Sequence, residues 1–204
     1  MAEHADACVG GALRALESGD ADAAVQVISD DADREHAHAQ IQNGVLAAIA
    51  LHHPVGTELR ALTGLLHAGL HVERMIELAV SMARTVQPSG HEPGDEDVVQ
   101  QLLEMGGLAR EVANRSVAGF LADAEEVAEE VERLDDAVDR LHHSIFERLM
   151  RLAASDVELL SWVTRMIQLT RQLERYADHG VDVAEQAVFV HTGEPVRLRR
   201  TASA

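Results

Sequence analysis

Apolar side chains recur at helical spacing along most of the chain. Between residues 55 and 86 they alternate steps of three and four, which is typical of a helix packed in a bundle: Leu62, Leu65, Gly69, Val72, Ile76, Ala79, Ala83 and Val86. Similar periodicity predicts five further helices, over residues 3–18, 21–53, 95–121, 123–153 and 155–191. The connections between them are short, so the pattern predicts an all-α protein.

One segment interrupts this pattern. Residues 87–97 form the only extended stretch of turn-forming and charged residues, and they divide the helices into two groups of three. We therefore expect two tandem three-helix bundles. The expected bounds are residues 1–87 for the first bundle, with a shortened first helix, 88–97 for the linker, 98–195 for the second bundle and 196–204 for a disordered basic tail.

The two groups of helices also repeat in residue identity. At an offset of 104, Val27 falls on Val131, Ile41 on Ile145 and His38 on His142. After a shorter connection the offset becomes 101, and Glu73-Arg74 then falls on Glu174-Arg175. Such matches at a nearly constant offset indicate an internal repeat.

Composition narrows the range of functions. The chain has 35 acidic residues and 17 basic ones, all of them Arg, for a net charge of -18. This balance argues against a nucleic-acid partner, because affinity for phosphate backbones needs clustered positive charge. No apolar run approaches the ~18 residues of a membrane span, and Met1 is not followed by a signal-like segment. We therefore expect a cytoplasmic protein without membrane insertion, with the single Cys8 buried in the core.

Carboxylates and a histidine interrupt the apolar stripe on the second helix of each half. Spacings of i, i+4 and i+7 place them on one face; they are Asp31, Glu35 and His38, then Asp135, Asp139 and His142. The third helices carry the pairs Glu73/Glu77 and Glu174/Asp178. Like charges four residues apart repel each other, and more strongly when removed from water. The pattern therefore predicts a compensating cation.

Four carboxylates per half, with His38 or His142 as optional nitrogen ligands, suit a carboxylate-bridged metal cluster better than a single tetrahedral zinc. Two simpler interpretations stay open: the acids form solvated faces, or Arg74 and Arg175 neutralise their neighbours without metal. Other histidines show no repeated placement and are interpreted as surface or helix-end residues: His52, His53, His67, His71, His91 and His143.

Two segments resemble the signatures of the PhoU family, whose usual form is Asp-Leu-Glu-Arg-Ile-Gly-Asp. They are His71-Val-Glu-Arg-Met-Ile-Glu77 and Gln172-Leu-Glu-Arg-Tyr-Ala-Asp178. The resemblance extends to residues 53–60, 135–141 and 184–194, and so covers nearly the whole chain. It implies two three-helix bundles with multinuclear metal clusters, and it assigns the second-half site to Asp135, Asp139, Glu174 and Asp178. The first-half site would comprise Asp31, Glu35, Glu73 and Glu77.

The resemblance also implies a function. Family members are cytoplasmic negative regulators of phosphate uptake and of the phosphate-starvation response, and act as adaptors between a phosphate ABC transporter's ATPase subunit and a sensor histidine kinase, usually as dimers. Fe or Zn is the favoured metal, with Mn and Mg as alternatives. This chain departs from the family pattern at Glu35 and Glu77, where aspartate is usual, and at Arg34, where an apolar residue is usual.

Three function classes follow. The leading one is a metal-binding adaptor without catalysis, since the chain has no nucleotide-binding glycine loop and no repeated Ser-His-Asp or Cys-His set. The alternative is a carboxylate-bridged di-iron oxidase or ferritin-like storage protein, because Glu35-x-x-His38 and Asp139-x-x-His142 match the ligand alternation of those bundles. An inert helical scaffold is the third. Two distant sites would favour the adaptor, and one central site the oxidase.

Overall fold

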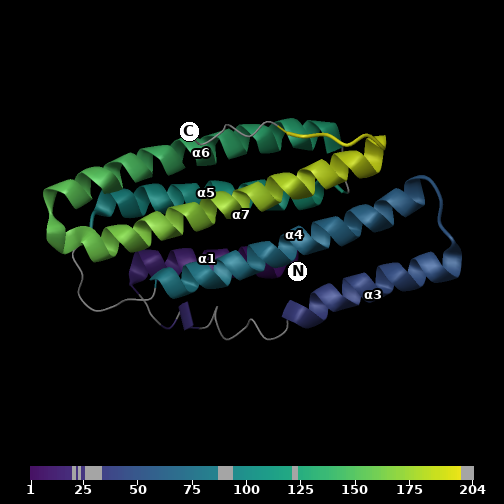
Figure 1. Cartoon of the computed structure of the whole chain (residues 1–204), viewed down its shortest axis with the longest axis horizontal. Coiled ribbons are helices and arrows are strands. Elements are labelled where there is room, and N and C mark those ends of the chain that lie inside the picture. The colour runs from purple at the N-terminus through teal and green to yellow at the C-terminus, as the bar shows by residue number, and fades with distance from the viewer. Residues whose placement is uncertain (20–21, 23, 26–33, 87–93, 121–123, 199–204) are drawn as a thin grey trace.

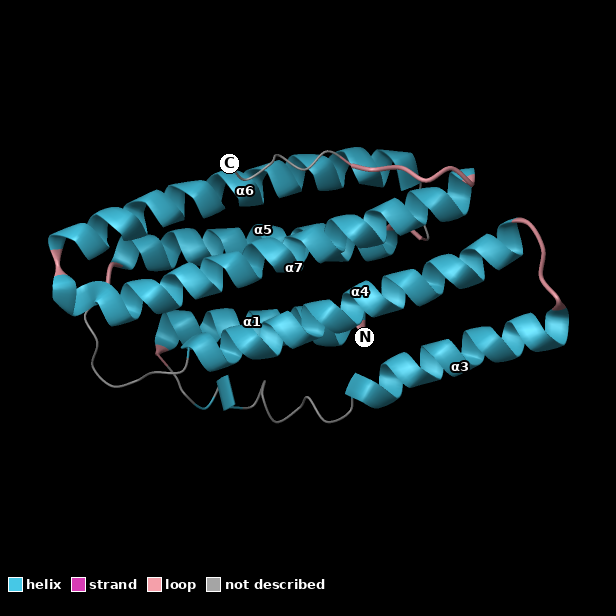
Figure 2. Ribbon diagram, in the orientation of Figure 1, coloured by secondary structure: helices cyan, strands magenta, loops and turns pink. Residues whose placement is uncertain are grey.

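The computed structural model of the chain describes residues 1–19, 22, 24–25, 34–86, 94–120 and 124–198, and for residues 34–37 and 125 it describes the backbone alone. All regular structure in this part of the chain is helical (Figure 1, Figure 2). The elements are α1 (Ala2–Ser18), α3 (Arg34–His52), α4 (Thr57–Val86), α5 (Glu96–Ala118), α6 (Ala124–Ser155), the 3-10 turn η2 (Val157–Leu159) and α7 (Leu160–Thr192). The all-α prediction is confirmed.

Helix ends follow from local sequence. Helix α1 ends at Gly19, which adopts a left-handed φ of 68° and donates its N–H to the Ala15 carbonyl. Helix α5 begins after Asp95, whose side chain accepts a hydrogen bond of 2.9 Å from the Val98 N–H. Arg148 of α6 also donates to this carboxylate through two nitrogens, at 3.0 and 2.9 Å. The start of α5 is thereby joined to α6.

Helices α4 and α7 lie side by side in the middle of the molecule and form its most extensive helix contact within the described residues (Figure 1). Helix α1 packs against α4, α5 packs against α7, and α1 and α5 also contact each other. The remaining long helices lie at opposite sides, with α3 against α4 and α6 against α7 and α5. The halves are therefore joined through α4, α7, α1 and α5.

The apolar stripe of α4 forms part of the core, as its spacing predicts. Val72, Ile76 and Ala79 are buried, whereas Leu65 is 44% exposed. Helix α4 still packs against α7 at this level, because the adjacent Gly64 faces Val190 of α7, so Leu65 lies on a side of α4 that α7 does not cover. The first turns of α4 project with α3 beyond the other helices (Figure 1). Cys8 is buried, as expected. None of the helices in the described ranges combines the length and the apolar character needed to cross a bilayer.

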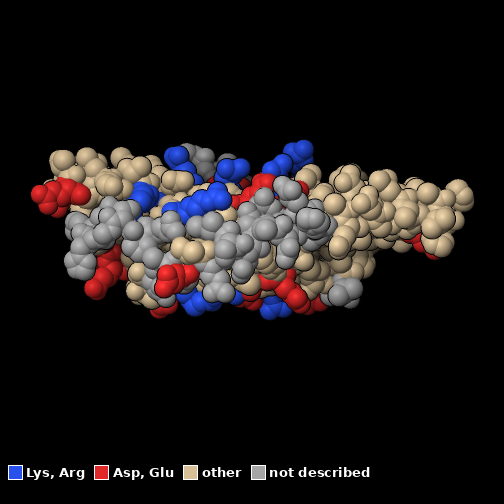
Figure 3. Space-filling model, turned by 90° about the horizontal axis from the view of Figure 1, so that it is seen from below, with Lys and Arg blue, Asp and Glu red and all other residues tan. Residues whose placement is uncertain are grey.

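The second half is more closed than the first. Helix α6 packs against both α5 and α7, whereas α3 packs chiefly against α4 alone. As a result, Leu46 and Leu51 of α3 are 54% and 73% exposed. In the view of Figure 3, the end of the molecule formed by α3 and the first turns of α4 carries few charged side chains.

The two halves meet in an approximately two-fold manner across α4 and α7. The Gln172 amide donates a hydrogen bond of 2.8 Å to the Ser81 hydroxyl. At the offset of 101, Gln172 corresponds to His71 and Ser81 corresponds to Asp182. His71 and Asp182 also contact each other, with 3.2 Å between Nδ1 and Oδ2. Each half thus contributes the same pair of positions to the interface.

Candidate functional site

The second-half acidic set lies on two packed helices, as its spacing predicts. Asp135 and Asp139 belong to α6, and Glu174 and Asp178 belong to α7. Asp135 is 3% exposed, and the other three are half-buried. A carboxylate so far removed from water needs a cation or hydrogen-bond donors nearby, because desolvation penalises its charged form. The α6–α7 contact therefore carries four carboxylates on facing helices, although among the described residues no three of their ligand atoms lie within 4.8 Å of one another.

His142 of α6 lies within the same set. Burial lowers the pKa of its imidazole, and the charges of Glu174 and Asp178 on the facing helix partly oppose that shift. Its Nδ1 is buried and has no hydrogen-bond partner among the described residues. An imidazole that stays neutral keeps a lone pair for a metal. His142 therefore has the form expected of a nitrogen ligand.

The first half shows the same juxtaposition of a histidine and a glutamate. His38 Nδ1 lies 3.6 Å from Glu73 Oε2, and this nitrogen likewise lacks a hydrogen-bond partner in the described structure. His38 and Glu73 are the repeat equivalents of His142 and Glu174. Asp31 lies outside the described residues, as does the side chain of Glu35 on α3. Glu73 and His38 are therefore the members of the first-half set brought together in the described structure.

Glu77, the fourth member of the first-half set, has another partner. Its Oε2 accepts a hydrogen bond of 2.6 Å from Arg74, three residues earlier on α4, and this bond raises the pKa of the Arg74 guanidinium. Arg175, the equivalent of Arg74, forms no ion pair in the described part of the chain. Neutralisation by a neighbouring arginine thus applies to Glu77.

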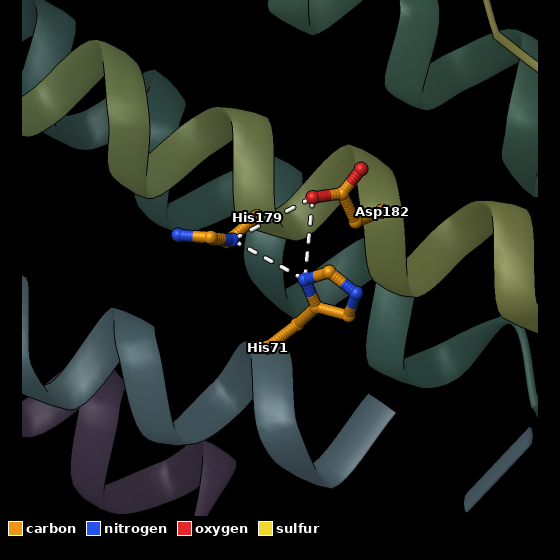
Figure 4. Close-up of side chains that lie close together, drawn as sticks. All are labelled: His71, His179 and Asp182. Atoms are coloured by element: carbon orange, nitrogen blue, oxygen red, sulfur yellow. Dashed lines mark hydrogen bonds and ion pairs between the residues drawn. The ribbon is translucent and has the colours of Figure 1, made fainter. Parts of the chain in front are cut away.

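A further cluster brings three ligand atoms closer together than the described members of either predicted set. It consists of His71 from α4 with His179 and Asp182 from α7, all within 4.8 Å of one another (Figure 4). The interpretation of His71 as a surface or helix-end residue was wrong, since it lies in the middle of α4 with its side chain 24% exposed. The available sequence signal was His179-x-x-Asp182, which shares one helical face.

The helix arrangement also separates the adaptor from the ferritin-like alternative. A single central site would require the two histidine-bearing helices to face each other. Instead α3 and α6 lie on opposite sides of the α4–α7 pair, and each contacts the acidic helix of its own half (Figure 1). The arrangement therefore keeps the α3–α4 and α6–α7 contacts apart and lends no support to one central site.

Fold and site together define a class: a tandem repeat of a three-helix unit whose second and third helices carry matched acidic residues. The family model described as PhoU domain matches residues 1–86 and again residues 102–187. The chain therefore belongs to the PhoU family, as its signature segments predict.

Named relatives agree with this assignment. The chain is 33% identical over 192 residues to the phosphate-specific transport system accessory protein PhoU homolog 2 of Mycobacterium tuberculosis, covering 89% of this chain and 85% of the relative. It is 27% identical over 187 residues to the Clostridium acetobutylicum homolog, covering 91% and 85%. The Streptococcus pneumoniae phosphate transport system regulatory protein PhoU matches in structure with a TM-score of 0.87 and 25% identity, over 97% of this chain and 92% of that one. The chain is thus a member of a family of phosphate-transport accessory proteins.

Proposed function

We propose that this chain is a metal-binding adaptor that negatively regulates phosphate uptake and the phosphate-starvation response. It acts in the cytoplasm without catalysis, by docking on the ATPase subunit of a phosphate ABC transporter and on a sensor histidine kinase. Family membership and the accessory role in the names of its relatives support the phosphate-transport part of this proposal.

One observation carries the metal-binding part. In each half a buried histidine Nδ1 without a hydrogen-bond partner among the described residues lies beside a repeat-equivalent glutamate: His38 beside Glu73, and His142 near Glu174. Repetition of this arrangement is hard to attribute to chance placement on a solvated face. Oxygen and imidazole donors together suit Fe and Zn, with Mn and Mg as alternatives.

The metal would be held between neighbouring helices of one half. In the second half Asp135 and Asp139 of α6 would share it with Glu174 and Asp178 of α7, and His142 supplies nitrogen. In the first half Glu73 and His38 would do so with Glu77, Asp31 and Glu35. A bound cation offsets the repulsion among these carboxylates, so metal loading would fix the packing of α6 on α7 and of α3 on α4. That packing sets the surface offered to partners.

A homodimer belongs to the same proposal, and the exposed leucines of α3 support it. Burial of Leu46 and Leu51 against a second copy would contribute roughly 1.5–3 kcal/mol for each fully buried side chain. Light scattering of the wild type and of a Leu46→Gln/Leu51→Gln variant tests this. We expect a dimer for the first and a larger monomer fraction for the second. A wild type that stays monomeric at tens of micromolar would contradict this part.

The metal is tested by elemental analysis after purification without chelators. The variant Glu174→Gln/Asp178→Asn removes two negative charges from the second-half site and keeps the side-chain shapes. The control Glu104→Gln/Glu158→Gln removes two exposed charges elsewhere. We expect metal loss from the first variant and wild-type content in the second. Equal metal content in all three proteins, or none in the wild type, would exclude the proposed site.

The adaptor role is tested by copurification from cells grown with ample phosphate. We expect the wild type to retain the transporter's ATPase subunit and the histidine kinase. The Glu174→Gln/Asp178→Asn variant separates the two parts of the proposal. If it still retains both partners but has lost metal, docking is independent of metal. Failure of the wild type to retain either partner would contradict the adaptor role itself.

A further inference from the structure

The cluster at the α4–α7 contact has the geometry of a small metal site. His71 Nδ1 lies 3.2 Å from His179 Nδ1 and 3.2 Å from Asp182 Oδ2, and the third side of the triangle, from His179 Nδ1 to Asp182 Oδ2, measures 3.5 Å. The three side chains point toward one another from the two helices (Figure 4). Each is 22–24% exposed, so the cluster is sheltered and still reachable from solvent.

These distances match tetrahedral coordination. An ion about 2.0–2.1 Å from each ligand in a tetrahedral site places the ligand atoms about 3.3 Å apart. Octahedral coordination at a similar bond length places neighbouring ligands only about 3.0 Å apart. The observed sides of 3.2, 3.2 and 3.5 Å therefore favour the tetrahedral case. Two histidines and one carboxylate are also a ligand combination that Zn²⁺ accepts.

Hydrogen bonds alone account for this triangle less well. Each imidazole Nδ1 carries at most one proton. If both protons point at Asp182, two donors face each other at 3.2 Å. If one Nδ1 is deprotonated, the single remaining proton can form a hydrogen bond between only one of the three pairs of atoms. A cation at the centre can bind all three ligand atoms at once, and the net charge of -18 favours its uptake.

The internal repeat supplies a metal-free version of the same contact. The repeat relates His71 to Gln172 and Asp182 to Ser81. Gln172 and Ser81 are joined by a hydrogen bond of 2.8 Å. A glutamine and a serine therefore suffice to pack α4 on α7. Packing of α4 on α7 therefore does not by itself require the two histidines and the carboxylate of the His71, His179 and Asp182 cluster.

We propose that His71, His179 and Asp182 bind one Zn²⁺ ion, which joins the two halves of the chain and leaves a fourth coordination position for water. This site is separate from the acidic sites on α3–α4 and α6–α7, and its existence does not depend on theirs. Because its ligands come from both halves, bound zinc stabilises the α4–α7 contact by mass action.

The test is zinc titration of the full chain after metal removal, by competition with a chromophoric chelator. The variant His71→Gln/Asp182→Ser removes two ligands and installs the pair that the chain already uses at positions 172 and 81. We expect it to bind one Zn²⁺ fewer than the wild type, with affinity at this site more than about 100-fold weaker, since changing only the outer-shell partners of a metal ligand already costs about 10–100-fold. The variant Glu174→Gln/Asp178→Asn should keep this zinc, which separates the site from the proposed acidic cluster.

Two further measurements guard against a folding defect. Without metal, His71→Gln/Asp182→Ser should melt near the wild type, and the gain in thermal stability on adding Zn²⁺ should be larger for the wild type than for this variant. Co²⁺ bound to the wild type should give the intense visible bands of four-coordinate geometry. The proposal is overturned if the variant binds Zn²⁺ with wild-type stoichiometry and affinity, or if wild-type Co²⁺ shows only the weak bands of octahedral coordination.

Discussion

Asp6 and Arg110 occupy equivalent positions in the two halves, at the offset of 104, and bind each other. The Asp6 carboxylate accepts hydrogen bonds from Arg110 Nε at 2.8 Å and Nη2 at 2.6 Å, and a third from Asn114 at 3.2 Å. The contact therefore lies where the approximate two-fold relation brings α1 against α5. Identical residues at both positions would place like charge against like charge, whereas the acid and the base found here form a bidentate pair.

The Asp6–Arg110 pair makes part of the stability pH-dependent. Hydrogen bonding to Arg110 holds the pKa of Asp6 below its ordinary value of 3.8. A depressed carboxyl pKa contributes stability that is complete above the unfolded pKa and is lost as the pH falls through the folded one. We expect Asp6→Asn to lower the free energy of unfolding by about 1 kcal/mol at pH 7. The difference from wild type should shrink below pH 3.8.

Urea denaturation at pH 7 and pH 3 checks this. The exposed Glu17 on the same helix provides the control, and Glu17→Gln should differ little from wild type at either pH. An Asp6→Asn deficit of equal size at both pH values would show that the ionised carboxylate is not its source.

Tyr176 carries a polar group that the fold does not use. The side chain is fully buried, burial raises the pKa of its phenol, and its hydroxyl has no hydrogen-bond partner among the described residues. A buried hydroxyl without a partner costs about 1–3 kcal/mol of desolvation. We expect Tyr176→Phe to be at least as stable as wild type in thermal denaturation. A loss of more than about 1 kcal/mol would reveal a hydrogen bond from that hydroxyl.

Gly180 allows α7 to approach α5 closely. A Cβ at this position would lie 2.8 Å from Val112 Cγ1 and 3.3 Å from backbone atoms of Ala113. We expect Gly180→Ala to destabilise the protein by about 1–3 kcal/mol, because the short β-branched side chain of Val112 has little freedom to move and the Ala113 backbone is also close. Thermal or urea denaturation measures the loss.

Gly107 on α5 is the matched control for this substitution. It is exposed and helical, and a Cβ there would meet nothing within 4 Å. Gly107→Ala should therefore stabilise by roughly 0.5–1 kcal/mol through helix propensity alone. If both substitutions change stability in the same direction, close packing at Gly180 is not what requires glycine.

Periodicity was sufficient to predict the helices, while the acidic metal sites inferred from repetition stay a prediction. The apolar stripe of α4 is buried from Gly69 onward, and His38 and His142 both lie beside the predicted glutamates. Leu65 was expected in the core because spacing shows which face is apolar but not which part of that face a neighbouring helix covers. The coverage of α4 depends on tertiary packing.

The His71 cluster was missed for a related reason. Searching for positions that repeat finds what both halves share, and His71 and Asp182 correspond to Gln172 and Ser81 instead. The cluster also needs residues 108 positions apart to meet across α4 and α7, which no local spacing encodes. That these non-repeated residues form a cluster becomes clear only from the packing of α4 on α7.

The two acidic sites should differ in affinity because of one arginine. In the first half Arg74 holds Glu77 at 2.6 Å, so a metal ion must displace a cation before this carboxylate can coordinate it. Arg175 makes no such bond to the described residues of the second half. We expect Arg74→Gln to tighten divalent-ion binding by the first-half site several-fold, since a surface ion pair contributes up to ~1 kcal/mol.

This difference can be measured one site at a time. The combined variant Glu174→Gln/Asp178→Asn/His71→Gln/Asp182→Ser retains only the first-half acidic site, and Arg74→Gln is added to it before calorimetric titration with Mn²⁺. The reciprocal background, Glu73→Gln/Glu77→Gln with the same His71 and Asp182 changes, receives Arg175→Gln. Arg74→Gln should have the larger effect, because Arg175 contributes only charge while Arg74 also occupies a ligand oxygen. Equal effects would show that net charge alone sets the affinity of both sites.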